Sequence, residues 1–176
     1  RDWLERDGST MSPGPRWLPT YSPGVELPNR QPQDKQHLVF FGRLETRKGL
    51  ELFVAALIRL AGDKELCMTP LRITFLGKVG AVGKRGALAY LSESLARLTE
   101  KWQWHTIHDL DQSGAMAFLA GNSGALFVIP SLADNSPNTV LECLRRGLRV
   151  IASDAPGVAE LFADKAHLAA PDPESL

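Results

Sequence analysis

Two carboxylates and several small polar residues lie together between Pro130 and Glu142. Asp134 is the first carboxylate, and Glu142 follows eight positions later in the chain. Between them, Ser136 and Pro137 have the pattern of a helix N-cap followed by proline in the first helical position. Backbone N–H groups at a helix start form a positively polarised site for an anion such as a diphosphate. This segment therefore predicts an anion site, with Asp134 at its mouth and Glu142 about two turns inside the helix.

The two carboxylates suit different parts of a sugar nucleotide. Glu142 is placed to accept hydrogen bonds from a ribose diol, and Asp134 is placed to hold sugar hydroxyls. Small polar side chains surround the helix start without blocking access to it: Asn135, Ser136, Asn138 and Thr139. The alternative is that Asp134 and Ser136 only cap a helix, and spacing alone favours the two interpretations equally.

A basic loop follows the first apolar run of the chain. Residues 38–41 are all apolar, and the loop behind them begins at Gly42 and ends at Gly49. Glycine lets the backbone approach a ligand closely, and Arg43 and Lys48 between the two glycines are placed to face a diphosphate. The alternative is a solvated basic turn. The acidic segment described above favours the ligand-binding interpretation.

These residues resemble the retaining group 1 glycosyltransferases, whose nucleotide-binding half carries two glutamates at the spacing of Asp134 and Glu142. Aspartate replaces glutamate at the first position here, which shortens the reach by one methylene group. The resemblance implies that Arg43 and Lys48 bind the donor diphosphate and that both act with Asp134 as catalytic residues. It also implies donor contacts from Gly42, from Glu142 and from the four small polar residues at the helix start.

The resemblance covers residues 38–173, most of the chain. Beyond the acidic pair, Gly147, residues 150–154, Gly157 and Glu160 resemble the strand and glycine turn that follow the motif helix in the family. His108 and Leu110 lie where the family contacts the nucleobase through backbone groups. The resemblance therefore adds these two residues to the expected donor site.

Short apolar runs alternate with helical stretches, which is typical of a doubly wound α/β fold. We expect a mainly parallel six-stranded sheet with helices on both faces. The strands are expected at residues 38–41, 71–76, 105–108, 125–129, 149–152 and 167–170, and the helices at 50–61, 86–101, 112–120, 137–146 and 158–162. Such sheets bind ligands beyond the C-terminal ends of their strands, where both candidate segments lie.

Two further segments have structural interpretations. Residues 77–86 are rich in glycine and cations, but they match neither a Walker loop nor a GxGxxG fingerprint, so we expect a loop between strand and helix. Trp102 and Trp104 are expected to pack at the helix end that precedes the third strand. No His, Cys or carboxylate set has metal-ligand spacing, so neither a metal nor another cofactor is expected.

Composition limits the class of protein. The chain has 176 residues, 44% of them hydrophobic, which is enough for a sizeable core. Its 20 basic and 20 acidic residues balance, which argues against bulk attraction to nucleic acid. With Cys67 and Cys143 as the only cysteines, a disulfide framework is not expected and a cytoplasmic location is the simpler expectation. No apolar run is long enough to span a bilayer, although the sequence is compatible with peripheral membrane contact.

Residues 1–36 are rich in proline and lack sustained periodicity, so we expect a connecting segment there and a donor-binding domain at 37–176. In the resembling family, an acceptor-binding domain precedes such a segment. Because the chain starts at Arg1 and stops at Leu176, we expect the C-terminal half of a longer enzyme, inactive alone. The expected partners are a nucleotide-diphosphate sugar and an acceptor glycan, lipid or small molecule bound by the missing domain.

Three alternatives stay open. A dinucleotide-dependent oxidoreductase has a related fold, but its glycine fingerprint is absent from the loop at 42–49. A noncatalytic nucleotide-sugar-binding module would explain the aspartate at Asp134 as a sign of lost activity. A sugar-nucleotide epimerase of similar fold is the third alternative.

Overall fold

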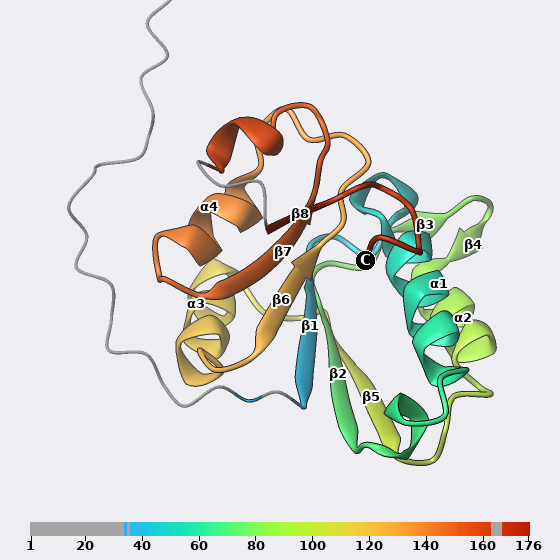
Figure 1. The fold of residues 1–176 in the computed structure, drawn as a ribbon. Helices are drawn as coiled ribbons and strands as arrows, with labels where there is room; N and C mark the ends of the chain where they lie inside the picture. Colours follow the sequence, from blue (N-terminus) through green and yellow to red (C-terminus); the bar gives the residue numbers. More distant parts are fainter. Residues whose placement is uncertain (1–33, 35, 163–166) are drawn as a thin grey trace, which may run out of the picture.

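A computed structural model describes residue 34 and residues 36–162 and 167–176, so the expected connecting segment lies almost entirely outside the described residues. In the described part, six parallel strands form the main sheet in the order β5, β2, β1, β6, β7, β8 (Figure 1). The expected six-stranded α/β sheet is therefore confirmed. Its strands are β1 (His37–Phe41), β2 (Leu71–Leu76), β5 (Trp102–Ile107), β6 (Leu126–Ile129), β7 (Arg149–Ser153) and β8 (Leu168–Ala169).

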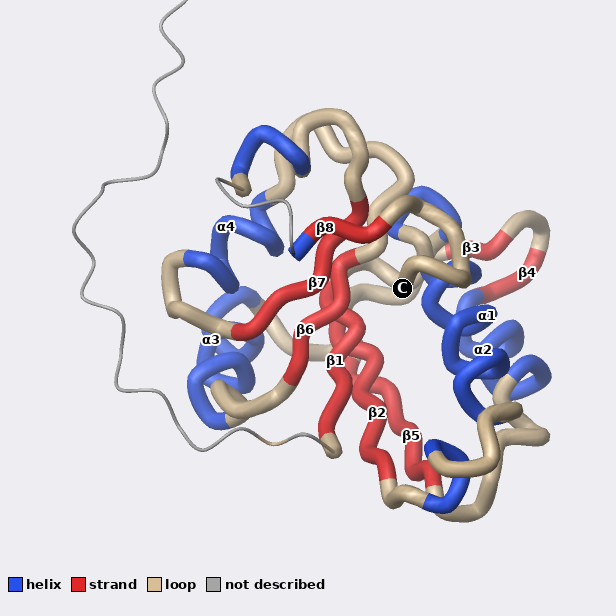
Figure 2. The backbone as a smooth tube through the Cα atoms, in the orientation of Figure 1, coloured by secondary structure: helices blue, strands red, loops and turns tan. Residues whose placement is uncertain are grey.

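Helices cover both faces of this sheet, as Figure 2 shows. Helices α1 (Leu50–Ala61) and α2 (Ala87–Ser94) pack on one face, and α3 (Gln112–Gly121) and α4 (Asn138–Leu144) pack on the other. A small hairpin of β3 (Ala81–Val82) and β4 (Arg85–Gly86) lies between β2 and α2, inside the segment expected to be a loop. Single 3-10 turns occur at Thr46–Lys48, Leu66–Met68 and Ala159–Leu161.

The two helical layers give the sheet a core on each face. On the side of α1 and α2, the rings of Phe40, Phe53 and Phe75 form a buried cluster with centroids 5.6–6.1 Å apart. On the side of α3 and α4, Leu119 and Phe127 are fully buried. Strands covered on both faces need apolar residues at successive positions. This explains why the central strands have continuous apolar runs.

The strand order contains a switch point between β1 and β6. The chain leaves β1 toward β2 and β5 on one side, and it leaves β6 toward β7 and β8 on the other. In open α/β sheets the loops at such a point diverge and leave a crevice beyond the carboxyl ends of the strands. The loops that follow Phe41 and Ile129 lie at this point of the sheet.

Several expected boundaries are wrong near the third strand. The helix expected at 86–101 ends at Ser94, and the strand expected at 105–108 begins at Trp102. The Thr99 hydroxyl accepts a hydrogen bond from the Lys101 N–H at 3.3 Å, which offers the backbone an alternative to the helix. Trp102 and Trp104 therefore lie in β5 and not at a helix end. Their packing role is confirmed, because Trp102 is buried and Trp104 meets Phe75 edge-on at 6.3 Å.

The last elements are shorter than expected. The helix expected at 158–162 is a single 3-10 turn, and the strand expected at 167–170 pairs with β7 only through Leu168 and Ala169. Such short elements carry little periodicity, so their bounds depend on the neighbouring strand. None of the described helices combines the length and apolar character needed to cross a lipid bilayer.

Candidate functional site

The loops that follow β1 and β6 touch through their backbones. Gly49 has a φ of +74°, and a Cβ there would lie 1.8 Å from the Pro130 backbone oxygen. Only glycine permits this conformation together with this contact. The N–H of Leu132 also donates to the backbone oxygen of Arg47 at 3.0 Å. Gly49 therefore lets the two loops come together. The sequence suggested that the backbone at Gly49 approaches a ligand, whereas in the structure it approaches the Pro130 backbone.

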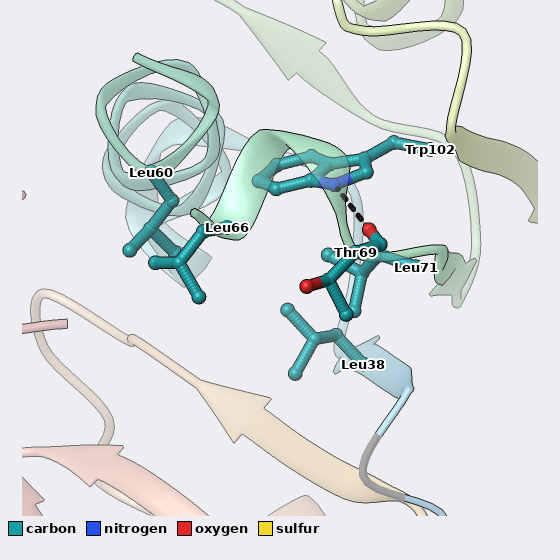
Figure 3. A pocket seen from close by; sticks show the side chains of 6 residues that line it. All are labelled: Leu38, Leu60, Leu66, Thr69, Leu71 and Trp102. Carbon is teal, nitrogen blue, oxygen red and sulfur yellow. Dashed lines mark hydrogen bonds between the residues drawn. The ribbon is translucent and has the colours of Figure 1, made fainter. Parts of the chain in front are cut away.

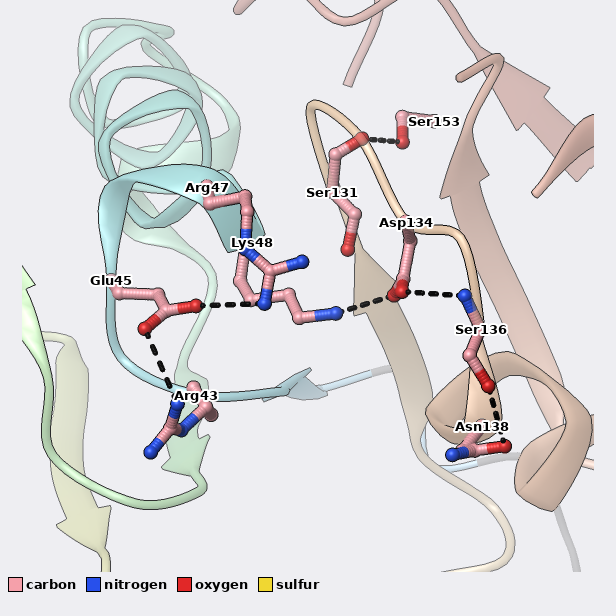
Figure 4. A network of polar contacts seen from close by, with 9 residues as sticks. All are labelled: Arg43, Glu45, Arg47, Lys48, Ser131, Asp134, Ser136, Asn138 and Ser153. Atoms are coloured by element: carbon pink, nitrogen blue, oxygen red, sulfur yellow. Dashed lines mark hydrogen bonds and ion pairs between the residues drawn. The ribbon is translucent and has the colours of Figure 1, made fainter. Parts of the chain in front are cut away.

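An ion pair joins the same two loops. The Lys48 ammonium donates to the Asp134 carboxylate across 86 positions of sequence (Figure 4). Both side chains are largely buried, with 13% of Lys48 and 5% of Asp134 exposed. The second carboxylate oxygen of Asp134 accepts the Ser136 N–H at 3.3 Å. The basic and acidic segments thus meet, and Asp134 is buried against Lys48 at the position where the sequence suggested the mouth of the anion site.

The loop after β7 supports Asp134 from the opposite side. Gly157 has a φ of +83°, and a Cβ there would lie 2.1 Å from the Asp134 backbone oxygen. The Ser153 hydroxyl donates to the backbone oxygen of Ser131, as Figure 4 shows. The loop that carries Asp134 is therefore fixed by contacts on both sides.

Two arginines lie at the exposed rim of the basic loop. Arg43 and Arg47 approach the Glu45 carboxylate at 3.9 and 3.3 Å, and their side chains are 62% and 56% exposed. Such exposed pairs contribute little stability. Either guanidinium can therefore turn toward an anion at small cost. Arg47 is one of the cations between Gly42 and Gly49 that the sequence places toward a diphosphate, although it was not selected as a site residue.

The start of α4 differs from the expected cap. The helix begins at Asn138, Pro137 is the residue before it, and no side chain caps its N–H groups. The predicted N-cap at Ser136 is therefore wrong, because its backbone oxygen accepts the Asn138 N–H at 2.7 Å while its hydroxyl approaches the Asn138 side chain at 3.5 Å. Asn135, Ser136 and Asn138 are exposed and Thr139 is half-buried.

Glu142 lies in the middle of α4 and is half-buried. Burial raises the pKa of Glu142, while a side-chain hydrogen bond from Gln112 and the charges of Arg146 and Arg145 act in the opposite direction. Gln112 is the first residue of α3, a position that sequence reasoning did not select. No local signal marks Gln112, because its partner lies on another helix.

The loop after β5 holds the residues expected to meet a nucleobase. His108 is half-exposed, and Leu110 packs partly against the core on the α3 and α4 face. Gly42 is buried beside the stem of Lys48, which lies 3.8 Å from a Cβ built at Gly42. The contacts of these three residues with a ligand stay predictions. In the described part of the chain, no three His, Cys, Asp or Glu side chains are grouped closely enough to hold a metal ion.

An apolar cavity of about 240 Å³ lies at the opposite end of the strands (Figure 3). Trp102 closes part of it and donates its indole N–H to the Thr69 backbone oxygen at 3.1 Å. The cavity lies near the N-terminal ends of β1, β2 and β5, away from the loops described above. Its lining residues are Leu38, Leu60, Leu66, Thr69, Leu71 and Trp102.

Residues 35–176 match the family model described as glycosyl transferases, group 1. No curated protein matches the chain in sequence. Among solved structures, it is similar to a sucrose-phosphate synthase from Thermosynechococcus elongatus, with 20% identity, a TM-score of 0.59, and 82% of this chain and 35% of that chain covered. It is also similar to the apo form of the lipopolysaccharide outer core galactosyltransferase WaaB, with 18% identity, a TM-score of 0.52, and 84% and 38% covered.

A third similar structure is the pneumococcal O-GlcNAc transferase GtfA in complex with UDP and GlcNAc. The identity is 19%, the TM-score is 0.53, and 77% of this chain and 24% of that chain are covered. At these identities the similarity shows the fold. The chain corresponds to between a quarter and two fifths of the length of these structures.

Proposed function

This chain belongs to the group 1 glycosyl transferases, and we propose that it is the donor-binding part of a retaining enzyme that transfers a hexose from a nucleoside-diphosphate sugar to an acceptor hydroxyl. The contact between the loops after β1 and β6 carries this proposal. It gathers the cations of one loop and the polar residues of the other at the switch point, where sheets of this type bind ligands.

Lys48 and Arg43 bind the donor diphosphate in this proposal. During transfer the bond between the anomeric carbon and a diphosphate oxygen breaks, and a bond to the acceptor oxygen forms. The nucleoside diphosphate leaves with additional negative charge, which fixed cations and N–H groups stabilise. Lys48 is held in place by its buried pair, and exposed Arg43 completes the anion site together with the start of α4 near Asn138 and Thr139. This stabilisation is electrostatic and uses no metal ion.

The two carboxylates have separate roles in this proposal. Asp134 holds the Lys48 ammonium in the site through their ion pair. Asn135 and Ser136, which follow Asp134 in the same loop, contact the donor sugar. Glu142 accepts the ribose hydroxyls. The loop with His108 and Leu110 contacts the nucleobase, and Gly42 leaves room for the diphosphate beside Lys48.

The acceptor site is proposed to lie in polypeptide beyond this chain. Sugar transfer needs donor and acceptor held together with water excluded, and the described residues supply the wall that holds the donor. We therefore expect the isolated chain to bind nucleotide and to transfer no sugar. A radiolabelled or mass-shifted product formed by the purified chain would contradict this part of the proposal.

Calorimetric titration with uridine, guanosine and adenosine diphosphates tests the donor site. We expect saturable binding of one nucleotide, weakened about tenfold or more by Lys48→Ala and by Glu142→Ala, since each removes a charged hydrogen-bond partner. Lys64→Ala and Glu65→Gln are the matched controls, because both side chains are exposed near the far ends of the strands. A folded chain that binds none of the three nucleotides would refute the proposed function.

A further inference from the structure

Ser131 lies opposite Lys48 where the loops after β1 and β6 meet. The backbone oxygen of the preceding residue, Pro130, packs against Gly49, where a Cβ would lie 1.8 Å away. The N–H of the residue that follows Ser131 donates to the Arg47 backbone oxygen at 3.0 Å. Because these two contacts join the sequence neighbours of both residues, Ser131 and Lys48 face each other across the two loops.

The Ser131 hydroxyl is buried and unpaired. The residue is fully buried, and its backbone oxygen accepts the Ser153 hydroxyl. Its own hydroxyl has no hydrogen-bond partner among the residues that the structure describes. Figure 4 shows this side chain pointing toward the Lys48 ammonium and the Asp134 carboxylate. A buried hydroxyl without a partner is uncommon and unfavourable, so one beside a charged pair indicates a partner gained in another state.

The Lys48 ammonium can supply that partner. An ammonium group donates up to three hydrogen bonds, and the bond to Asp134 uses one of them. The Lys48 side chain is 13% exposed, whereas the Ser131 hydroxyl is closed to solvent. A ligand can therefore reach the ammonium but not the hydroxyl, so Ser131 can act on a ligand only through Lys48.

We propose that Ser131 is a positioning residue of the donor site, whose hydroxyl accepts a hydrogen bond from the Lys48 ammonium when a diphosphate is bound. This inference rests on the proposed function. The three N–H groups of the ammonium then go to Asp134, to Ser131 and to a phosphate oxygen. With two fixed acceptors in the protein, the ammonium directs its third N–H at the ligand. The hydroxyl should therefore strengthen diphosphate binding without stabilising the free protein.

This role separates the effect on binding from the effect on stability. Ser131→Ala removes a group that has no described partner in the free protein, so the urea midpoint should stay equal or rise. The same variant should weaken binding of the nucleoside diphosphate about threefold to tenfold, because the complex loses one hydrogen bond from a charged donor. Ser153→Ala is the matched control for stability. Ser153 is equally buried but its hydroxyl is bonded, so the midpoint should fall.

The experiment combines urea unfolding with calorimetry on the whole chain, using uridine, guanosine and adenosine diphosphates and inorganic pyrophosphate. The loss in Ser131→Ala should be the same factor for pyrophosphate as for the nucleotide that binds, because the effect lies at the diphosphate. Ser131→Cys keeps an atom in place of the oxygen but offers a weak acceptor, so it should weaken binding as well. Ser92→Ala, exposed on α2, should change neither binding nor the midpoint.

Three outcomes would overturn this inference and leave the proposed function intact. These are unchanged affinity in Ser131→Ala, a loss of affinity together with a lower midpoint, and full affinity in Ser131→Cys, which would show that the side chain only fills space. A folded chain that binds pyrophosphate but none of the nucleotides would refute the proposed function, and the pyrophosphate titrations would then decide the role of Ser131. A folded chain that binds neither would overturn both.

Discussion

Replacing Lys48 by methionine keeps most of the aliphatic stem and removes the ammonium group that pairs with Asp134. Because the aspartate side chain is only 5% exposed, the variant leaves a buried negative charge without its cation. Breaking a buried pair in this way costs about 3–5 kcal/mol. The Ser136 N–H still donates to Asp134 at 3.3 Å, so we expect a loss in free energy of unfolding of about 3 kcal/mol.

Asp134→Asn should cost less. The amide oxygen can still accept the Ser136 N–H, and the 13%-exposed Lys48 can extend its ammonium toward water. In the double variant neither charge is left buried alone, so its loss should fall well below the sum of the single losses. We expect a coupling energy of at least about 2 kcal/mol.

Urea unfolding followed by tryptophan fluorescence measures all four proteins of this cycle. The matched control is the pair of Arg59 and Glu174, which is in contact at 2.7 Å but has side chains 62% and 71% exposed. Its cycle should give less than about 1 kcal/mol, since water screens the pair. If the losses in unfolding free energy at Lys48 and Asp134 are additive, or if both cycles give the same coupling energy, burial does not strengthen the pair of Lys48 and Asp134.

Two further predictions concern His37 and Gly157. Burial and the nearby Arg72 lower the pKa of His37 from 6.5 to about 4, so neutral His37 stabilises the fold above pH 6.5 and that contribution is lost as the pH falls toward 4. The free energy of unfolding should therefore fall between pH 7 and pH 4.5, and the fall should be up to about 3 kcal/mol larger in the unchanged protein than in His37→Gln. An equal fall in the two proteins would show that His37 does not cause the pH dependence. Gly157→Ala should destabilise the fold by more than about 1 kcal/mol and weaken nucleotide binding, because its Cβ would collide with the Asp134 backbone oxygen. The control is Gly83→Ala, at a φ of +57° with open space around it, which should cost about 1 kcal/mol and leave nucleotide binding unchanged. If both alanine variants have the same effects on unfolding and binding, the collision at Asp134 does not explain the loss in Gly157→Ala.

Local sequence determined the parts of the fold whose signals are strong. The bounds of α1 and β2 match the predicted ranges, because each pattern is flanked by glycine or proline on both sides. Strand β5 was predicted three residues too short at its start. Its tryptophans suit a strand as well as a helix end, and the parallel register with β2 decides between them.

In the candidate site too, local sequence predicted some features and tertiary contacts decided others. The sequence predicted that the cations near Lys48 and the acids near Asp134 follow strands and face one crevice, and strand order explains why they meet. It could not predict that the Lys48 and Asp134 side chains pair directly. That contact depends on how two distant loops pack, and neither residue has a neighbour in sequence that indicates its partner.

The loop between β6 and α4 has two close backbone contacts: Gly49 packs against Pro130, and Gly157 packs against Asp134. Because backbone contacts hold this loop, its outward side chains are not needed to keep its shape. Laboratory evolution of donor choice can therefore randomise the exposed Asn135, and with it Ser136 and Asn138, while both glycines stay unchanged. The fold thus separates the positions that can acquire new specificity from those that preserve the frame.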